Sequence, residues 1–373
     1  MADPKVLRDL ALVFTKLGLT AFGGPAAHIA MMQRELVQEK RWVEEQRFMD
    51  LVGGVNLIPG PNSTELAIHI GHDRAGWRGL IIAGLCFILP AVLITGTIAH
   101  FYRLYGTLPQ VQSFIFGIKP AIIGIMLGAV YPLARQSAKS MKLIVLGSLV
   151  LLLAMLGVNE ILLLFGAGLA MLIAKCATNG DKRASGFFPI VLPALSCASE
   201  ATNQKLFLIF LKVGALLYGS GYVLFSFLDA ELVDRGMISR QQLIDAVAVG
   251  QFTPGPVFSS VTFVGYQING WQGALVSTVG IFLPSFIFVA LLNPLVKKMR
   301  ASQSMSVFLD AVNIASVALI ISVCFLMAKD TITDWRTTVI GIISIIVTFR
   351  YKKINSALII LGGAISGYLF LLF

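Results

Sequence analysis

Long apolar stretches, separated by short polar segments, follow one another along the whole chain. The hydrocarbon core of a bilayer is about 30 Å thick and takes about 20 residues of α-helix to cross. The stretches that are long enough, or nearly so, lie near 9–33, 79–102, 112–134, 142–158 and 160–175, and near 205–229, 273–296, 304–328, 334–349 and 355–373. The pattern therefore predicts an all-α polytopic membrane protein with about ten transmembrane helices.

Pro-Gly-Pro interrupts two further apolar segments, at residues 59–61 and at residues 254–256. Proline removes a backbone donor and clashes with the preceding helical turn, so each tripeptide must break any helix that contains it. The arms on either side lie near 46–58 and 62–72, and near 241–253 and 257–267. An arm of this length reaches only about 15 to 20 Å, so neither arm spans the membrane alone.

Composition agrees with a membrane environment. The chain is 57% hydrophobic and 13% charged, with a mean hydropathy of +0.83, whereas soluble domains carry about 25% charged residues. The net charge of +10 comes from short basic clusters between apolar stretches, which indicate membrane topology rather than nucleic-acid binding. The first apolar stretch is too long for a cleaved signal peptide. The four scattered cysteines contain no C-x-x-C pair, so we expect neither a disulfide framework nor a thiolate metal site.

The two Pro-Gly-Pro segments bring the halves of the chain into register. KLGLTAFGGPAAH (16–28) aligns with KVGALLYGSGYVL (212–224), and GWRG (76–79) aligns with GWQG (270–273). Single residues align at nearly the same spacing: Asp50 with Asp245, Asn56 with Gln251, and Leu89-Pro90 with Leu283-Pro284. An ordered series of matches at one spacing indicates a duplication. We expect a first transmembrane repeat at 1–180, a cytoplasmic linker at 181–203 and a second transmembrane repeat at 204–373.

Two topologies are open for the Pro-Gly-Pro segments. Each segment enters and leaves on the same side of the membrane, or its two arms cross together as one broken helix. Basic residues gather on the cytoplasmic side of membrane proteins. The re-entrant topology places most lysines and arginines on one side, whereas the crossing topology divides them evenly. We therefore predict two re-entrant broken-helix hairpins and an inverted second repeat. Residues 34–47, Arg74, Arg78, the linker and 297–300 would be cytoplasmic, with both termini outside.

Broken helices at membrane depth indicate a substrate site. Irregular backbone is tolerated there only where protein buries it or a watery cavity adjoins it. Inverted repeats with broken helices are typical of secondary transporters, which bind the substrate near the breaks. A helix N-terminus carries about half a positive charge and binds anions. FGGPAAH (22–28) and YGSGY (218–222) can break the first helix of each repeat, so four helix ends would suit a dianion.

The predicted substrate-binding residues lie at these breaks or one to two turns before them: Lys16, Gly23, Gly24, Asn56, Gly60, Asn62, Ser63, Thr64, Lys212, Gly219, Ser220, Gly221, Gln251, Thr253, Gly255 and Ser259. A lysine at membrane depth is costly unless it faces a partner or a cavity. Lys16 and Lys212 are therefore candidates for the anion, with snorkelling to the interface or pairing with a helix end as the alternative. Lys119, beside Pro120, is a supporting candidate, although Asn313 replaces it in the second repeat.

Glu65, His69 and His72 share one helical face and have the spacing of metal ligands. The trio is not duplicated in the second repeat, which favours a buried carboxylate with two interfacial histidines over a metal site. We expect no metal and no cofactor. Glu65 is a candidate for proton coupling, because a buried carboxyl group can take up and release a proton. His28, on the first helix, is ambiguous in the same way.

The sequence also resembles a known family. FGGPAAHIAMMQRELV and DLVGGVNLIPGPNSTELAIHIG in the first half, with YGSGYVLFSFLDAELV and AVGQFTPGPVFSSVTFVGYQINGWQGA in the second, are similar to the chromate ion transporter (CHR) family, in its duplicated form. The resemblance implies export of chromate, a tetrahedral oxyanion, across the bacterial inner membrane and hence chromate resistance. Two alternatives stay open: another anion such as sulfate or an organic anion, and a membrane-embedded metalloenzyme built on Glu65, His69 and His72. The resemblance leaves the oligomeric state open.

Overall fold

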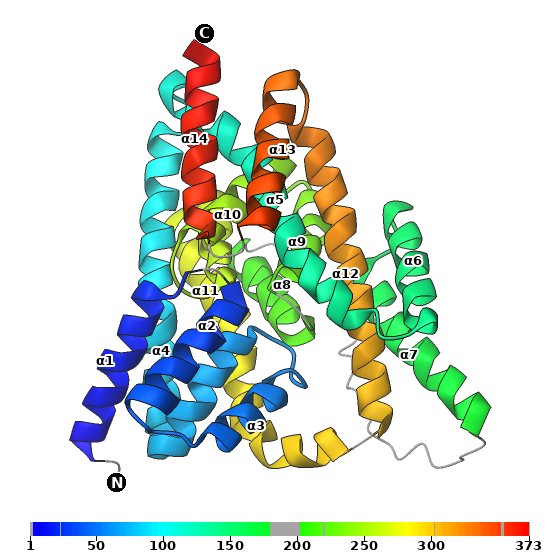
Figure 1. The fold of residues 1–373 in the computed structure, drawn as a ribbon. Coiled ribbons are helices and arrows are strands. Elements are labelled where there is room, and N and C mark those ends of the chain that lie inside the picture. Colours follow the sequence, from blue (N-terminus) through cyan, green and yellow to red (C-terminus); the bar gives the residue numbers. More distant parts are fainter. Residues whose placement is uncertain are drawn as a thin grey trace.

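The computed structural model describes residues 3–22, 24–179, 202–218, 221–301, 303–351 and 354–372. All of its regular elements are helical over these residues (Figure 1). The first half contains α1 (Pro4–Thr20), α2 (Gly24–Met32), η1 (Gln33–Glu39), α3 (Glu45–Val55), α4 (Asn62–Tyr105), α5 (Pro109–Ser137), α6 (Met141–Met155) and α7 (Glu160–Asn179). The second half contains α8 (Thr202–Leu216), α9 (Val223–Leu228), η2 (Asp229–Val233), α10 (Arg240–Phe252), η3 (Val257–Ser259), α11 (Ser260–Ala301), α12 (Gln303–Thr331), α13 (Trp335–Arg350) and α14 (Ser356–Leu372).

Several helices have the length and apolar surface of membrane spans. Four described segments qualify by length and hydropathy: Asn62–Tyr105, Pro109–Ser137, Val257–Leu291 and Ser304–Thr331. Large apolar side chains such as Leu93, Leu149 and Leu358 are at least half exposed. Such surfaces are unfavourable in water and are satisfied by lipid tails. The chain is therefore a helical multi-pass membrane protein.

Each repeat opens with two helices that fold back, where the sequence predicts a single span. α1 ends at Thr20 and α2 begins at Gly24, whose φ of 81° favours glycine. Lys16 Nζ and Glu35 Oε2 then lie 2.6 Å apart although 19 residues separate them. In a straight helix these residues would be about 28 Å apart. The chain must therefore turn sharply at the break between the two helices.

The second repeat turns in the same way between α8 and α9, because Lys212 Nζ lies 2.6 Å from Glu231 Oε1. The expected full spans at 9–33 and 205–229 are thus each divided into two shorter helices. In Figure 1, α1 begins and α14 ends at opposite ends of the molecule.

The Pro-Gly-Pro segments separate helices where the sequence places the arms. α3 and α10 precede the tripeptides, and α4 and η3 follow them. A second turn comes soon afterwards, because Ala75-Gly76 in α4 and Asn269-Gly270 in α11 have non-helical backbone angles. Gly71 and Gly79 pack backbone to backbone across the first of these turns. A residue larger than glycine would hold the two helical segments apart.

The two repeats are interlocked rather than side by side. α5 packs against α13 and α14 of the other repeat, and α12 packs in turn against α6 and α7. Gly117 of α5 lies against the backbone of Gly363 and Gly367 of α14, and small residues of this kind let membrane helices approach closely. Each repeat therefore completes the other.

Part of the predicted organisation lies outside the described residues. These are Gly23, Gly219, Ser220 and almost all of the linker expected at 181–203.

Candidate functional site

The helix breaks of the two repeats meet through reciprocal hydrogen bonds. The N–H of Gly60 donates to the carbonyl oxygen of Leu217 at 2.8 Å, and the N–H of Gly255 donates to that of Ala21 at 2.8 Å. Ala21 and Leu217 occupy related positions after the first helix of each repeat. Each Pro-Gly-Pro segment is thus hydrogen-bonded to the first break of the other repeat.

The two central glycines adopt backbone angles that other residues avoid. Gly60 has a φ of 134° and Gly255 a φ of 94°. A Cβ on Gly255 would lie 2.8 Å from Cβ of Ala91 and 3.2 Å from the carbonyl oxygen of Gly18. A Cβ on Gly60 would overlap the side chains of Glu65 and Ser285. Conformation and space therefore both require glycine here.

Polar side chains from both repeats surround the breaks. The Tyr222 hydroxyl donates to Gln251 Oε1 at 3.1 Å and lies close to the backbone of Gly24. His28 Nδ1 lies 3.2 Å from Ser63 Oγ. Three predicted site residues are therefore in contact with these two side chains: Gln251 and Gly24 with Tyr222, and Ser63 with His28. In addition, Asn62 Nδ2 donates to Asn56 Oδ1 at 2.6 Å, Thr253 Oγ1 donates to the Val249 carbonyl at 2.9 Å, and Gly221 lies beside Val257 and Phe258.

Several polar atoms at the breaks are buried without a hydrogen-bond partner among the described residues. They are Thr64 Oγ1, both carboxyl oxygens of Glu65, Gln251 Nε2, Ser260 Oγ and Ser285 Oγ. Burying a polar group without a hydrogen bond costs about 1 to 3 kcal/mol. A native structure tolerates a cluster of such groups when function requires it. The cluster lies where the sequence predicts substrate binding.

Glu65 makes this cluster asymmetric between the repeats. Its side chain is completely buried and faces Gly60 and Ser285. The related position of the second repeat is Ser260, and the position related to Ser285 is Ala91. The first Pro-Gly-Pro break therefore has a carboxyl group and a hydroxyl group where the second has a hydroxyl group and a methyl group.

Lys16 and Lys212 already have acidic partners in their own repeats. Lys212 and Glu231 are both largely buried, and Glu231 also accepts from Arg235 at 2.7 Å. Lys16 is more than half exposed beside Glu35. These ion pairs join the two arms of each folded-back segment. The alternatives to anion binding were snorkelling and pairing with a helix end. The structure shows neither of these arrangements, because each lysine forms an ion pair with a glutamate of its own repeat.

The three residues with metal-ligand spacing do not gather into a metal site. No group of three His, Cys, Asp or Glu side chains in the described part of the chain is placed to hold a metal ion. His69 is buried, and its Nδ1 has no partner among the described residues. His72 packs edge-on against Trp77.

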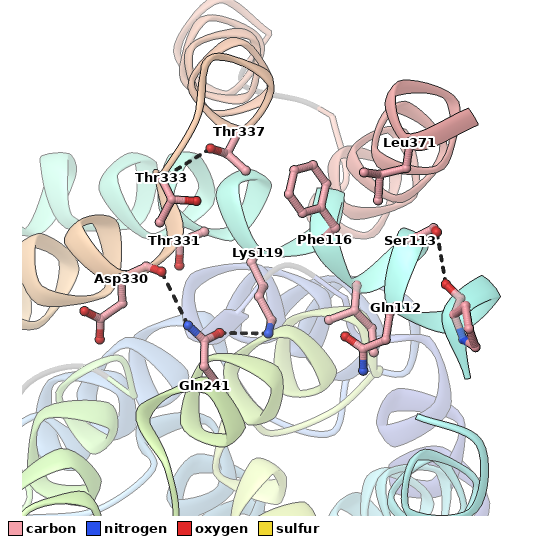
Figure 2. A pocket seen from close by; sticks show the side chains of 12 residues that line it. Gln112, Ser113, Phe116, Lys119, Gln241, Asp330, Thr331, Thr333, Thr337 and Leu371 are labelled. Atoms are coloured by element: carbon pink, nitrogen blue, oxygen red, sulfur yellow. Dashed lines mark hydrogen bonds between the residues drawn. The ribbon is translucent and has the colours of Figure 1, made fainter. Parts of the chain in front are cut away.

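Lys119 lies away from the breaks, at the base of a pocket of 450 Å³ (Figure 2). Its Nζ donates to Gln241 Oε1 at 2.8 Å and lies 3.5 Å from Asp245 Oδ1. The pocket opens between the start of α5, the start of α10, the α12–α13 loop and the end of α14, and its lining includes Gln112, Ser113, Phe116, Asp330, Thr333 and Leu371.

Sequence reasoning missed Tyr102, Tyr222 and Ser285. Tyr102 donates to Asp245 Oδ2 at 2.6 Å, from α4 to α10. The duplication had singled out Asp245 as the partner of Asp50, and a carboxylate in an apolar helix implies a nearby donor. That signal indicated that a partner exists without identifying it.

Both halves of this chain match one protein family. Residues 8–172 and residues 204–368 each match the family model described as Chromate transporter. The chain belongs to the chromate transporter family. It is 31% identical to a probable chromate transport protein of Synechococcus elongatus, over 98% of this chain and 95% of the relative. It is 30% identical to a chromate transport protein of Cupriavidus metallidurans, over 98% and 94%, and 30% identical to one of Pseudomonas aeruginosa, over 95% and 90%.

Membership of the chromate transporter family confirms the resemblance drawn from the Pro-Gly-Pro blocks. The matched relatives are transport proteins, so the chain is a transporter and not an enzyme. The metalloenzyme alternative is not favoured. No solved structure matches the chain.

Proposed function

We propose that this chromate transporter family member is a secondary transporter that exports chromate across the bacterial inner membrane and so confers chromate resistance. The observation that carries the proposal is the match of both repeats to the family, together with relatives named chromate transport proteins over nearly the full chain. Sulfate or another anion on the same scaffold is the alternative, because sulfate offers the same four oxygens and two charges.

Electrostatics supports export. Moving one elementary charge through 100 mV is worth about 2.3 kcal/mol, so a dianion leaving a cell that is negative inside gains about 4.6 kcal/mol. At about 1.36 kcal/mol per tenfold, this supports an outward gradient of about three orders of magnitude. Export therefore needs no ATP, and the sequence has no G-x-x-x-x-G-K-[ST] loop.

The substrate site of this proposal lies at the crossed breaks. The buried unpartnered groups of Thr64 and Gln251, with Ser63, Ser259 and the N-terminus of α4, supply hydrogen-bond donors for oxyanion oxygens. Glu65 is the proton-coupling residue of the proposal. We leave Lys16 and Lys212 out of the site, because glutamates of their own repeats neutralise them.

The test of function is flux of labelled chromate and labelled sulfate in proteoliposomes under an imposed potential. We expect chromate to leave the negative compartment, with a rate that rises as the potential grows. Protein-free liposomes and the Gly255→Ala variant are the controls. Sulfate flux without chromate flux would assign the transporter to the alternative substrate, and absence of both would contradict anion transport.

We also propose that the repeats are inverted. In Figure 1 the chain passes from α4 to α5 at the top of the molecule and from α11 to α12 at the bottom, which supports an axis of symmetry in the membrane plane. The expected count of about ten full spans is not kept, because the first segment of each repeat is folded back. The repeat boundaries of this proposal are 1–180 and 204–373.

Cysteine labelling tests the inversion at Arg78→Cys and Gln272→Cys, in a chain whose own cysteines are replaced. These residues occupy related, exposed positions after the turns of α4 and α11. Inverted repeats place them on opposite faces, so a membrane-impermeant maleimide should label each from a different side of oriented vesicles. Labelling of both from the same face would contradict the inversion.

A further inference from the structure

The two Pro-Gly-Pro hairpins are related in sequence but differ in environment. Met49 of α3 is 53% exposed, whereas Ile244, its related residue in α10, is 1% exposed. Two more related pairs show the same difference. Asp50 and Asn56 of the first repeat are exposed, whereas their counterparts Asp245 and Gln251 are at least 95% buried. An exposed aspartate is costly in lipid even when it is paired, so we place this face of α3 in water.

Packing produces this difference. α10 packs against α5 of the first repeat and α14 of the second repeat. The related partners of α3 would be α12 and α7, and α3 makes no comparable contact with either over the described residues. Two copies of one structural unit are therefore in two states, with α10 enclosed and α3 open.

Three side chains join the enclosed hairpin to the first repeat. Asp245 of α10 accepts a hydrogen bond from Tyr102 of α4 at 2.6 Å and lies 3.5 Å from Nζ of Lys119 on α5. The side chain of Lys119 is 17% exposed, and that of Asp245 is 7% exposed. We call Tyr102, Lys119 and Asp245 the α10 latch. Separating a largely buried ion pair without new partners is costly, so the latch resists movement of α10.

The pocket in Figure 2 ends at this latch. Its lining includes Lys119, and Gln241 of α10 bridges Lys119 to the carbonyl oxygen of Asp330. Lys119 of α5 and Gln241 of α10 thus meet at the inner end of the pocket. It lies at the end of the molecule where α14 ends, opposite the end where the chain begins (Figure 1).

The open side carries the basic segments. Arg47 lies on α3, Arg34 lies in η1, and Arg74 and Arg78 flank the turn of α4. An excess of basic residues marks the cytoplasmic side. The exposed α3 hairpin thus lies on the predicted cytoplasmic side, whereas the enclosed α10 hairpin adjoins the pocket. Asn313 replaces Lys119 in the second repeat, so the sequence is asymmetric at the same place as the structure.

We propose that the α10 latch is the outer gate of the transport path, and that transport exchanges the environments of the two hairpins. When the latch opens, α10 leaves α5 and the pocket joins the breaks, while α3 closes against α12. This inference rests on the proposed transport function but not on the identity of the anion.

The test uses Met49→Cys and Ile244→Cys as matched reporters in a cysteine-free chain in oriented vesicles. With the latch intact, a membrane-impermeant maleimide should label position 49 rapidly from the cytoplasmic face, and position 244 should be protected. Lys119→Gln should raise labelling at 244 from the other face and lower labelling at 49. We expect changes of about tenfold or more, the population shift that about 1.4 kcal/mol produces.

Lys139→Gln is the control, because it removes an exposed Lys–Asp pair, with Asp310, at the other end of α5. It should change neither reporter. Unchanged labelling in Lys119→Gln would overturn the gate, and so would a rise at both positions, which indicates loosening rather than exchange. The labelling assay needs no substrate. A rise at position 244 with a fall at position 49, in a protein that carries no chromate flux, would therefore support the gate and contradict the proposed substrate.

Discussion

Gly255→Ala should abolish anion flux, whereas Gly236→Ala should leave it near the wild-type rate. Both glycines have positive φ, 94° and 67°, so alanine is strained at either position by about 1 to 2 kcal/mol. Only at Gly255 does the new Cβ also meet Ala91 and Gly18, whereas nothing lies within 4 Å at Gly236. Overpacking adds about 1 to 3 kcal/mol and forces apart the crossed breaks of the two repeats.

The measurements are flux in proteoliposomes and thermal unfolding of the purified variants with and without chromate. Gly255→Ala protein should still insert, unfold at a lower temperature and lose the stabilisation that chromate gives. Gly60→Val should behave in the same way, because its side chain would overlap Glu65 and Ser285. Wild-type flux and chromate stabilisation in both variants would remove the crossed breaks from the substrate site.

Glu65→Gln should remove the pH dependence of flux while chromate still stabilises the protein. Glu65 is completely buried, and its carboxyl oxygens have no hydrogen-bond partner among the described residues. A charged carboxylate in that position is costly, so its charge must be coupled to a change in its surroundings. Glutamine has the shape of the protonated acid and cannot release a proton.

The assay is flux measured across a series of pH values at constant imposed potential. Glu35→Gln is the matched control, since Glu35 is also a buried carboxylate but is paired with Lys16. Its pH profile should keep the wild-type shape. If Glu65→Gln kept that shape as well, Glu65 would be a structural residue, and the asymmetry between Glu65 and Ser260 would need another explanation.

Local backbone chemistry made much of the fold predictable. Proline has no N–H and clashes with the preceding turn, so Pro59 and Pro254 ended α3 and α10 close to where the sequence places the arms. The same reasoning placed α4 at Asn62. Hydrophobic length predicted the long helices, and the repeated blocks identified the family. The sequence could not predict that the first segment of each repeat folds back, because glycines permit a turn without setting its angle.

The environment of charged residues was harder to predict. Lys16 and Lys212 were expected at the anion because a buried charge needs compensation, and the sequence could not rank Glu35 and Glu231 above a substrate. Asp245 and Lys119 are far apart in sequence and on different repeats. Contacts of that kind depend on which helices pack together.

By itself the sequence determined the membrane environment, the duplication, the four breaks and the family, because each follows from residues that are adjacent or evenly repeated. Only the tertiary structure decided that each Pro-Gly-Pro segment bonds to the first break of the other repeat, through Gly60 with Leu217 and Gly255 with Ala21. It also decided that α10 is buried while α3 is exposed. The pattern shared by the two hairpins does not show which of them is enclosed, because that depends on the packing of α5 and α14 against α10.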